Sequence, residues 1–324
     1  MKEIARRMAP VVALAALAPC AMAQNFPSKP IRILTTSASG TPGDVLTRLV
    51  ASKMSVRLNQ PVVVEARPGA GGTLAAAEMV RAPHDGHTLL FTSNMIVVSR
   101  HLLAKSAVDI QTELLPLSHA AEALSFVVVH AAVAANNVRE LVEYARANPG
   151  KLSFGTNGNG SALHLTGEAF KLATGTDFLH VPYSGATQGT RLNDFFSGRI
   201  PLDWSAYNSI RGYVGSGKIK TLAVLDRTRF KALPDVPAIT EIYPDYEFSS
   251  SYWLYMGPMG LPAPVLARLE QELQLGLRDP ETVKRADDMG IKAVGSNSKE
   301  AVAYYKSDLA ITEKLAKIVG LKPQ

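Results

Sequence analysis

Two short loops, each rich in glycine and small polar residues, are the parts of the chain best suited to hold a ligand. Residues 37–44 read SASGTPGD, and residues 154–161 read FGTNGNGS. A strand pattern precedes each loop and a helical pattern follows it, so the free amides at the start of a helix lie beside the loop. Such amides, with the partial positive charge of a helix N-terminus, form a site for an anion. The two loops therefore favour binding of a carboxylate, with half of the site in each loop.

The candidate contacts are the glycines, hydroxyls, amides and ionisable groups in or near these loops. The first loop offers Ser37, Ser39, Gly40, Thr41 and Asp44, and the second offers Thr156, Asn157, Gly158, Asn159, Gly160 and Ser161. Polar residues elsewhere that are expected to line the same cleft are Ser93, Asn94, His164 and Tyr183. Ser161 is expected to cap the second helix, and Pro42 to stand in the first turn of the first helix.

Two alternatives stay open for these residues. The first loop is also consistent with an ordinary strand-to-helix turn that Asp44 caps. His164, a lone histidine on a helix, is also consistent with a structural or capping role. Trp204 and Tyr207 have the size to stack on an aromatic ligand, but we expect them in the core.

Motifs for catalysis and cofactor binding are missing from the sequence. Leu163 stands where a dinucleotide fingerprint has its third glycine, and no Gly-Lys-Ser/Thr follows the second loop. There is no Gly-x-Ser-x-Gly elbow and no His-Glu-x-x-His pair, and the seven histidines show no metal-binding spacing. We therefore expect no enzyme activity, no metal and no cofactor.

The N-terminus has the order of a cleaved secretory signal. A basic start, an apolar run and a small-residue cleavage site follow one another: Lys2, Arg6 and Arg7, then residues 11–17, then Ala21-Met22-Ala23. The apolar run is shorter than the roughly 20 residues that span a bilayer. We expect cleavage after Ala23 and export to the periplasm of a Gram-negative bacterium. Lipidation of Cys20 is the alternative, and Pro19 disfavours it.

The composition indicates a soluble two-lobed protein without a nucleic-acid partner. The chain has 324 residues, of which 47% are hydrophobic and 19% charged, enough for more than one small core. The formal charge is +6, and removal of the signal's three cations and one anion leaves +4. Basic residues form no block and no pattern with aromatic residues, which argues against nucleic acid.

Alternating strands and helices must position the two loops. Strand patterns occur at 31–35, 62–65, 88–92, 126–129, 152–155, 178–182, 222–225 and 252–256. Helical patterns occur at 45–58, 73–80, 138–147, 162–172, 263–277 and 298–319. This order predicts an α/β fold of two lobes, each a mostly parallel sheet flanked by helices. We assign residues 24–124 to lobe 1, 125–249 to lobe 2, and 250–324 to a segment that returns to lobe 1.

Seven stretches in a fixed order make the chain resemble the extracytoplasmic receptors of the tripartite tricarboxylate transporter system, the Bug family. They are FPSKPIRIL, QPVVVEARPGAGGTLAA, APHDGHTLLFTSN, NPGKLSFGTNGNGSALHLTGEAF, HVPYSGATQGTRLNDFFSGRI, GSGKIKTLAVLDRTRFKALPDVPAITE and YWLYMGPMGLPAPVLARL. The resemblance implies a periplasmic binding protein of type II, whose lobes close by a hinge on a carboxylate in the interlobe cleft. It also implies that residues 37–44 and 156–161, with His164, hold the ligand.

The chain departs from the family pattern within and beside the first loop, and in a segment of the second lobe at residues 201–205. Thr36 and Ser37 stand where the family usually has Pro and Phe, and Thr41 replaces a glycine. In the second lobe the usual Asp-x-x-Phe-Asp becomes PLDWS at residues 201–205, which adds Asp203 and Ser205 to the candidate contacts. These changes leave the identity of the acid open among dicarboxylates, tricarboxylates, amino acids and aromatic acids.

The sequence thus predicts a monomeric periplasmic receptor that captures a small organic acid and passes it to two integral-membrane transporter subunits. One alternative is a binding protein that reports to a membrane signalling protein, which a partner assay would distinguish. Another is an enzyme on the same scaffold, with Asp44 or His164 as acid or base, which would turn the bound acid over.

Overall fold

A computed structural model describes residues 26–103, 106–183, 188–246 and 251–321, and the expected signal peptide lies outside these residues. The strands form two sheets. The first has the order β11-β4-β10-β3-β1-β2 and the second the order β7-β6-β8-β5-β9. Strands of the first sheet are β1 (Ile31–Thr35), β2 (Val62–Ala66), β3 (Thr88–Ser93), β4 (Leu114–Ala123), β10 (Tyr252–Pro258) and β11 (Ile291–Ala293). Strands of the second are β5 (Ser125–His130), β6 (Ser153–Thr156), β7 (Leu179–Pro182), β8 (Leu202–Ala206) and β9 (Ile219–Val224).

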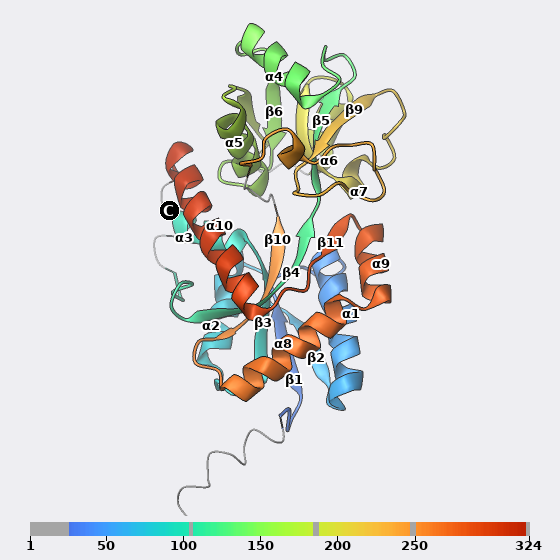
Figure 1. The fold of residues 1–324 in the computed structure, drawn as a ribbon. Helices are drawn as coiled ribbons and strands as arrows, with labels where there is room; N and C mark the ends of the chain where they lie inside the picture. Colours follow the sequence, from blue (N-terminus) through green and yellow to red (C-terminus); the bar gives the residue numbers. More distant parts are fainter. Residues whose placement is uncertain (1–25, 104–105, 184–187, 247–250, 322–324) are drawn as a thin grey trace, which may run out of the picture.

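Helices cover both faces of the first sheet (Figure 1). One face carries α1 (Pro42–Leu58), α8 (Ala263–Leu277) and α9 (Pro280–Asp288). The other carries α2 (Thr73–Arg81), preceded by the short helix η4 (Ala70–Gly72), with α3 (Met95–Leu102) and α10 (Ser298–Ile318). Because side chains alternate along a strand, Ile33 packs toward α1 whereas Leu34 packs toward α2. Two apolar layers therefore hold this lobe.

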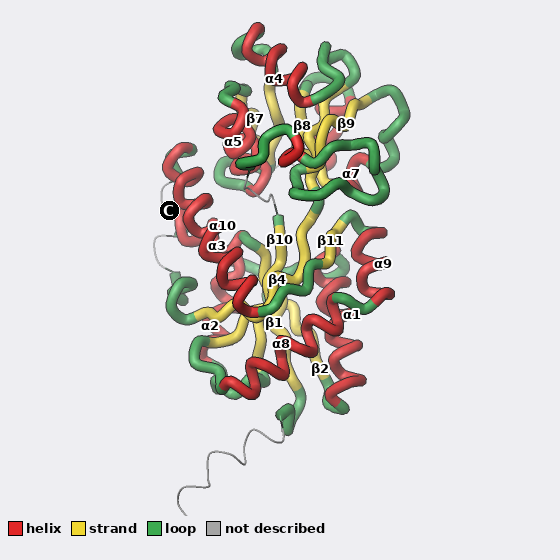
Figure 2. The backbone as a smooth tube through the Cα atoms, viewed as in Figure 1, coloured by secondary structure: helices red, strands yellow, loops and turns green. Residues whose placement is uncertain are grey.

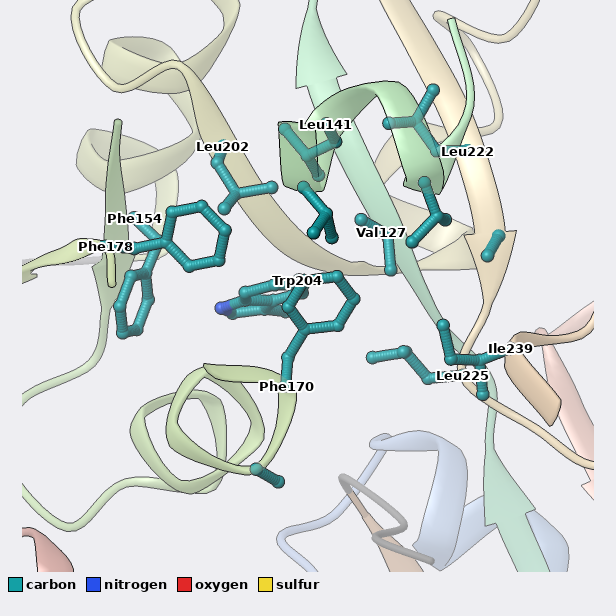
Figure 3. Packing of buried hydrophobic residues seen from close by; sticks show 14 of the residues in the cluster. Val127, Leu141, Phe154, Phe170, Phe178, Leu202, Trp204, Leu222, Leu225 and Ile239 are labelled. Carbon is teal, nitrogen blue, oxygen red and sulfur yellow. The ribbon is translucent and has the colours of Figure 1, made fainter. Parts of the chain in front are cut away.

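The second sheet is likewise covered on both faces. One face carries α4 (Val138–Ala147) and α5 (Ala162–Thr174), and the other α6 (Gln188–Phe196) and α7 (Tyr207–Ile210), while η5 (Ile239–Glu241) follows β9. Trp204 is fully buried at the centre of the first face, 4.8 Å from the Phe170 ring (Figure 3). The ring of Tyr207 packs on Phe230. The expectation of a core position is confirmed for Trp204, whereas Tyr207 is partly buried and packs against the core.

Two crossings and one long helix join the lobes. β4 leads through Leu124 into β5, and the chain returns to the first sheet at β10. α10 runs from the first sheet toward α5 (Figure 2). At one end the Ser298 hydroxyl donates to the carbonyl of Pro116 on β4, and near the other end Leu315 joins the core of the second lobe. None of the described helices is long and apolar enough to cross a membrane.

The α/β fold with two lobes is confirmed, but both sheets are mixed, which corrects the expectation that they are mostly parallel. β10 pairs antiparallel with β3 and β4, and β5 pairs antiparallel with β8 and β9. The reason is that β5 and β10 each begin at a crossing and run away from it, whereas the neighbours with which they pair, β8 and β9 or β3 and β4, run toward it. The residue ranges predicted from the sequence also lacked β4, β8 and β11 and the helices α3, α6, α7 and α9.

Candidate functional site

The predicted ligand loops lie at the edges where the two sheets face each other. β10 begins just after the crossing and pairs antiparallel with β3, so β3 ends at the edge where β10 begins. β1 pairs parallel with β3 and therefore ends at the same edge. β6 and β7 run parallel to β8, which pairs antiparallel with β5, so these strands end at the facing edge. Residues 36–41 and 93–94 therefore follow strands on one side, and residues 157–161 and 183 on the other. The topology therefore places the predicted loops on facing edges of the two sheets.

The first loop is held by hydrogen bonds of its own polar groups. Pro42 stands in the first turn of α1, as expected. Asp44 is only 3% exposed, and its carboxylate accepts from the Gly40 amide at 3.0 Å and from Arg48 Nε at 2.9 Å. Burial opposes ionisation of Asp44, but these two hydrogen bonds outweigh it and hold its pKa below the ordinary value. The Thr41 hydroxyl donates to the carbonyl of Ala38. These hydrogen bonds match the alternative in which residues 37–44 form an ordinary strand-to-helix turn that Asp44 caps.

Donors converge beside Gly43 at the start of α1. A Cβ atom placed on Gly43 would lie 2.5 Å from Ser37 Oγ and 2.6 Å from the indole Nε1 of Trp253 on β10. The amides of Gly43 and Asp44 belong to the first turn, where a helix supplies no acceptor. A hydroxyl, an indole N–H and two amides therefore lie close together. Trp253 was missed by sequence reasoning, because only the pairing of β10 with β3 brings it beside this loop.

The loop after β3 adds a buried amide side chain. Ser93 Oγ lies 3.4 Å from the Met95 amide, a weak contact that leaves its hydroxyl available. Asn94 is 3% exposed, and its Oδ1 has no hydrogen-bond partner among the described residues. Because buried polar atoms are normally paired and an amide oxygen only accepts, Asn94 Oδ1 is a candidate contact for a donor group of a ligand rather than for its carboxylate.

A glycine-rich turn at residues 69–72 packs against the same edge. All four residues have positive φ, including Ala70 at 44°, a conformation that favours glycine. A Cβ atom on Gly72 would lie 2.9 Å from Thr92 Oγ1 and 3.1 Å from Thr36 Cγ2. The close approach of this backbone to the ends of β1 and β3 fixes their polar residues. Sequence reasoning did not place this GAGG segment at the site.

The second loop is organised by histidines. Ser161 caps α5, as expected, by accepting from the His164 amide at 3.3 Å. His164 Nδ1 in turn accepts from the Gly160 amide at 3.0 Å, so the proton of the neutral ring is on Nε2, which lies 3.9 Å from Glu168. This hydrogen bond matches the alternative in which His164 is structural. The amides of residues 162 and 163, in the first turn of α5, have no acceptor within the helix.

His180 on β7 completes this arrangement and was not predicted. Its ring stacks on that of His164 with centroids 3.8 Å apart, and its Nε2 lies 2.6 Å from Thr156 Oγ1. Thr156 Oγ1 also accepts from the Gly158 amide. Burial, and then the neighbouring His164, lower the pKa of His180 to about 4, and burial lowers that of His164. Both rings are therefore neutral at neutral pH and act as a rigid support. Asn157 and Asn159 are exposed beside them.

The remaining candidates in the second lobe contact one another. Asp203 and Ser205 point to the same face of β8, where Asp203 is fully buried and bonded to both Ser205 and Arg191. The Tyr183 hydroxyl donates to Asp194 at 2.7 Å. Burial, and then Asp194, raise the pKa of Tyr183 to about 12. These groups brace α6 against the sheet, and their bonds leave no free carboxylate at residue 203.

The assembled groups suit binding of an anion better than acid–base chemistry. Asp44 and His164, which the enzyme alternative requires, are both engaged in hydrogen bonds that hold the loops. Arg48 and Arg191 are each paired with an aspartate. No group of three His, Cys, Asp or Glu residues that could hold a metal ion occurs in the part of the chain that the structure describes.

Comparison with known proteins places this fold in a family. The profile of the tripartite tricarboxylate transporter family receptor matches residues 46–321. A UPF0065 protein of Bordetella bronchiseptica is 32% identical over 317 residues, which cover 98% of this chain and 93% of that protein. Protein BugT of Bordetella pertussis is 28% identical over 276 residues, 84% of each chain.

Solved structures agree with these matches. The periplasmic binding protein BugD superposes with a TM-score of 0.67 at 29% identity, covering 92% of this chain and 100% of that one. Rpa4515 of R. palustris, solved with adipate, gives a TM-score of 0.70 at 27% identity with the same coverage. The fold and family are those of solute-binding proteins rather than of enzymes. The chain belongs to the receptors of the tripartite tricarboxylate transporter family, the Bug proteins.

Proposed function

We propose that the protein is a periplasmic receptor that holds a small carboxylate between residues 37–44 of one lobe and residues 156–161 of the other. The supporting observation is the convergence of donors beside Gly43, where Ser37 Oγ and Trp253 Nε1 meet the first-turn amides of α1. The N-terminus of α5 follows β6 at the edge of the second sheet that faces the first lobe, which supports a second half of the site there. Neutral donors of this kind bind a carboxylate through charge-assisted hydrogen bonds.

An acid with two carboxylates is the ligand that we expect first. Each lobe supplies one helix start, and an anion is favourable at each of them. The adipate-bound relative, at 27% identity, supports the same class of ligand. Thr36 and Ser37, which stand where the family usually has Pro and Phe, make the first loop more polar than those two residues would.

A thermal-shift screen of the mature protein tests this proposal. The panel holds dicarboxylates, citrate-like acids, acidic amino acids, and benzoate- and pyridine-type acids, with the corresponding diamides as neutral controls. An acid at about a hundred times its dissociation constant adds roughly 2.7 kcal/mol to stability, which is a visible rise in unfolding temperature. Stabilisation by one class of acid, and not by its diamide, is the expected result. Equal stabilisation by the diamide, or none by any acid with ligand-free protein, contradicts the proposal.

Export and delivery are further parts of the proposal. Cleavage after Ala23 would give a mature chain beginning at Gln24, which mass spectrometry of the periplasmic protein can check. The family description supports delivery of the ligand to membrane subunits of a transporter. Ligand-dependent co-purification with two transporter subunits is the expected result. Co-purification with a membrane signalling protein instead would favour the sensory alternative.

A further inference from the structure

A second pocket, of about 680 Å³, lies beside the crossing strands. Its walls come from β4, β11 and α10 of the first lobe, and from the segment after β9 and Tyr246 of the second. β11 and β9 are the edge strands next to β4 and β5, whereas the ligand loops follow β1, β3, β6 and β7 on the opposite side of the crossing. This hinge pocket is therefore separate from the candidate carboxylate site and is lined by both lobes. Its volume is that of a site for a small molecule.

Two buried polar atoms in the lining lack partners. His119 is 4% exposed, and its Nε2 has no hydrogen-bond partner among the described residues. The nearest group recorded for this atom, Oε1 of Glu122, is 3.6 Å away, which is too long for a hydrogen bond. The hydroxyl of Tyr246, a residue 6% exposed, is also unpaired among the described residues. Burial of unpaired polar atoms is unfavourable, so two in one pocket indicate a ligand that pairs with them.

The charges of the lining favour a cation. Four carboxylates line the pocket, from Glu122, Asp226, Glu300 and Asp308, against two cations, from Lys292 and Arg227. Lys292 Nζ is bonded to both oxygens of Asp226, at 2.9 and 3.1 Å, and reaches Glu122 only at 4.0 Å. An added positive charge would therefore be stabilised, and an added anion would be repelled.

Of these four carboxylates, Asp226 is hydrogen-bonded to Lys292, and Glu300 accepts from the Asn297 amide at the start of α10, which leaves Asp308 and Glu122 to meet a ligand. Asp308 accepts a hydrogen bond from the Tyr252 hydroxyl at 2.7 Å, and burial raises its pKa to about 6. Burial also raises the pKa of Glu122, although the Tyr304 hydroxyl hydrogen-bonds to it. A cationic group placed between them would favour the ionised form of both.

Aromatic rings form one wall of this pocket and suit an organic cation. The rings of His119 and Tyr304, which line the pocket, stack with centroids 4.0 Å apart, and Tyr252, which is fully buried and outside the lining, meets Tyr304 edge-on at 4.9 Å. The face of a tyrosine ring attracts an ammonium group and the carbon chain next to it. A metal ion is disfavoured, because the described residues hold no metal-binding group of three.

We propose that the hinge pocket binds a small organic molecule with a protonated amine, whose ammonium group pairs with Asp308 and Glu122 and whose apolar part packs on Tyr304. Both lobes line the pocket, so its shape changes when the lobes move. Occupancy of this pocket and of the carboxylate site then influence each other by the same factor. Binding of the amine itself does not depend on the proposed carboxylate function.

Calorimetry with simple amines tests this inference on the mature protein. The probes are 2-phenylethylamine and 1,4-diaminobutane, and the neutral controls of matching shape are 2-phenylethanol and 1,4-butanediol. Saturable binding of at least one amine, with no binding of its alcohol, is the expected result. Binding of neither amine, or equal binding of an alcohol, overturns the proposal.

Variants locate the amine. Asp308→Asn keeps the acceptor for Tyr252 and removes the charge, and Glu122→Gln does the same at the second carboxylate. Each should weaken the amine by about tenfold. Glu313→Gln, on the exposed side of α10, is the matched control and should change nothing. Unchanged affinity in both pocket variants overturns the inference. So does tighter amine binding in Ser161→Asp, because a carboxylate added at the start of α5 strengthens the amine only if the amine binds at the carboxylate loops.

Discussion

Replacement of Ser161 by aspartate separates ligand binding from helix stability. Ser161 caps α5 through its hydroxyl, which accepts from the His164 amide at 3.3 Å. Aspartate is an equally good N-cap, and its charge at a helix start is favourable by roughly 0.3–1 kcal/mol. We therefore expect the unfolding temperature of Ser161→Asp to equal or exceed that of the wild type.

The same charge should exclude a carboxylate ligand. An acid bound by the first-turn amides of α5 would place its carboxylate about 5 Å from the new side chain. At an effective dielectric constant of about 20, two like charges at that distance repel by about 3 kcal/mol. This energy corresponds to a loss of affinity on the order of 100-fold. The new carboxylate would also compete for the amides at residues 162 and 163.

Isothermal titration with the acid that stabilises the wild type most gives the answer. Ser161→Asn is the matched control, because asparagine caps a helix as well as aspartate but carries no charge. The variant with asparagine should keep its affinity within a few fold. If the variant with aspartate binds the acid as tightly as the variant with asparagine, α5 does not hold the carboxylate and the reasoning fails.

Three further predictions test other parts of the site. Trp253→Phe keeps an aromatic ring but removes the indole N–H beside Gly43. The acid should therefore bind about tenfold more weakly, with little change in unfolding temperature. Unchanged affinity in calorimetry would argue against an indole contact. The pKa of His180 is lowered to about 4 in the fold, so the folded state binds fewer protons than the unfolded chain. The stabilisation that His180 contributes is therefore complete above about pH 6.5 and is lost as the pH falls toward 4. Between pH 7 and 4 the unfolding temperature of His180→Gln should fall less than that of the wild type. Equal falls would refute the role of the histidine stack. Asp203→Asn leaves the buried guanidinium of Arg191 without its counter-ion. The free energy of unfolding, measured by urea denaturation, should fall by about 3–5 kcal/mol, and the affinity for the acid should not change. A loss of affinity with normal stability would instead place Asp203 at the ligand.

Local sequence patterns predicted the parts of the site that depend on neighbours in the chain. The cap at Ser161 and the proline in the first turn of α1 follow from rules that act over a few residues. The alternation of strands and helices likewise predicted two lobes, because each unit buries its own apolar faces. These features needed no knowledge of which strands pair.

Contacts between distant segments were not predictable in the same way. Trp253 reaches the first loop only because β10 pairs with β3, and His180 reaches His164 only because β7 lies beside β6. β4 was missed because its sequence LLPLSHAAEA contains proline and alanines, which disfavour strands, while pairing with β10 and β11 holds it in the sheet. Tertiary pairing overrides local preference at these positions.

The two ionisable residues of the first and second loops illustrate a different limit. Asp44 and His164 have residue types that contact ligands or act as acids and bases, yet both complete the hydrogen bonds of their own loops. Sequence alone could not separate these roles, because both require the same residue beside a helix start. The hydrogen-bond partners separate them.

Amide NMR of the mature protein during titration with the stabilising acid tests the central claim most directly. A carboxylate held between the lobes should shift the amides of Gly43 and Asp44 in α1 and of Ala162 and Leu163 in α5 more than any others. Shifts in both groups with a single dissociation constant are the predicted result. Shifts confined to one loop, or centred on the hinge pocket, would contradict a carboxylate site built from both lobes.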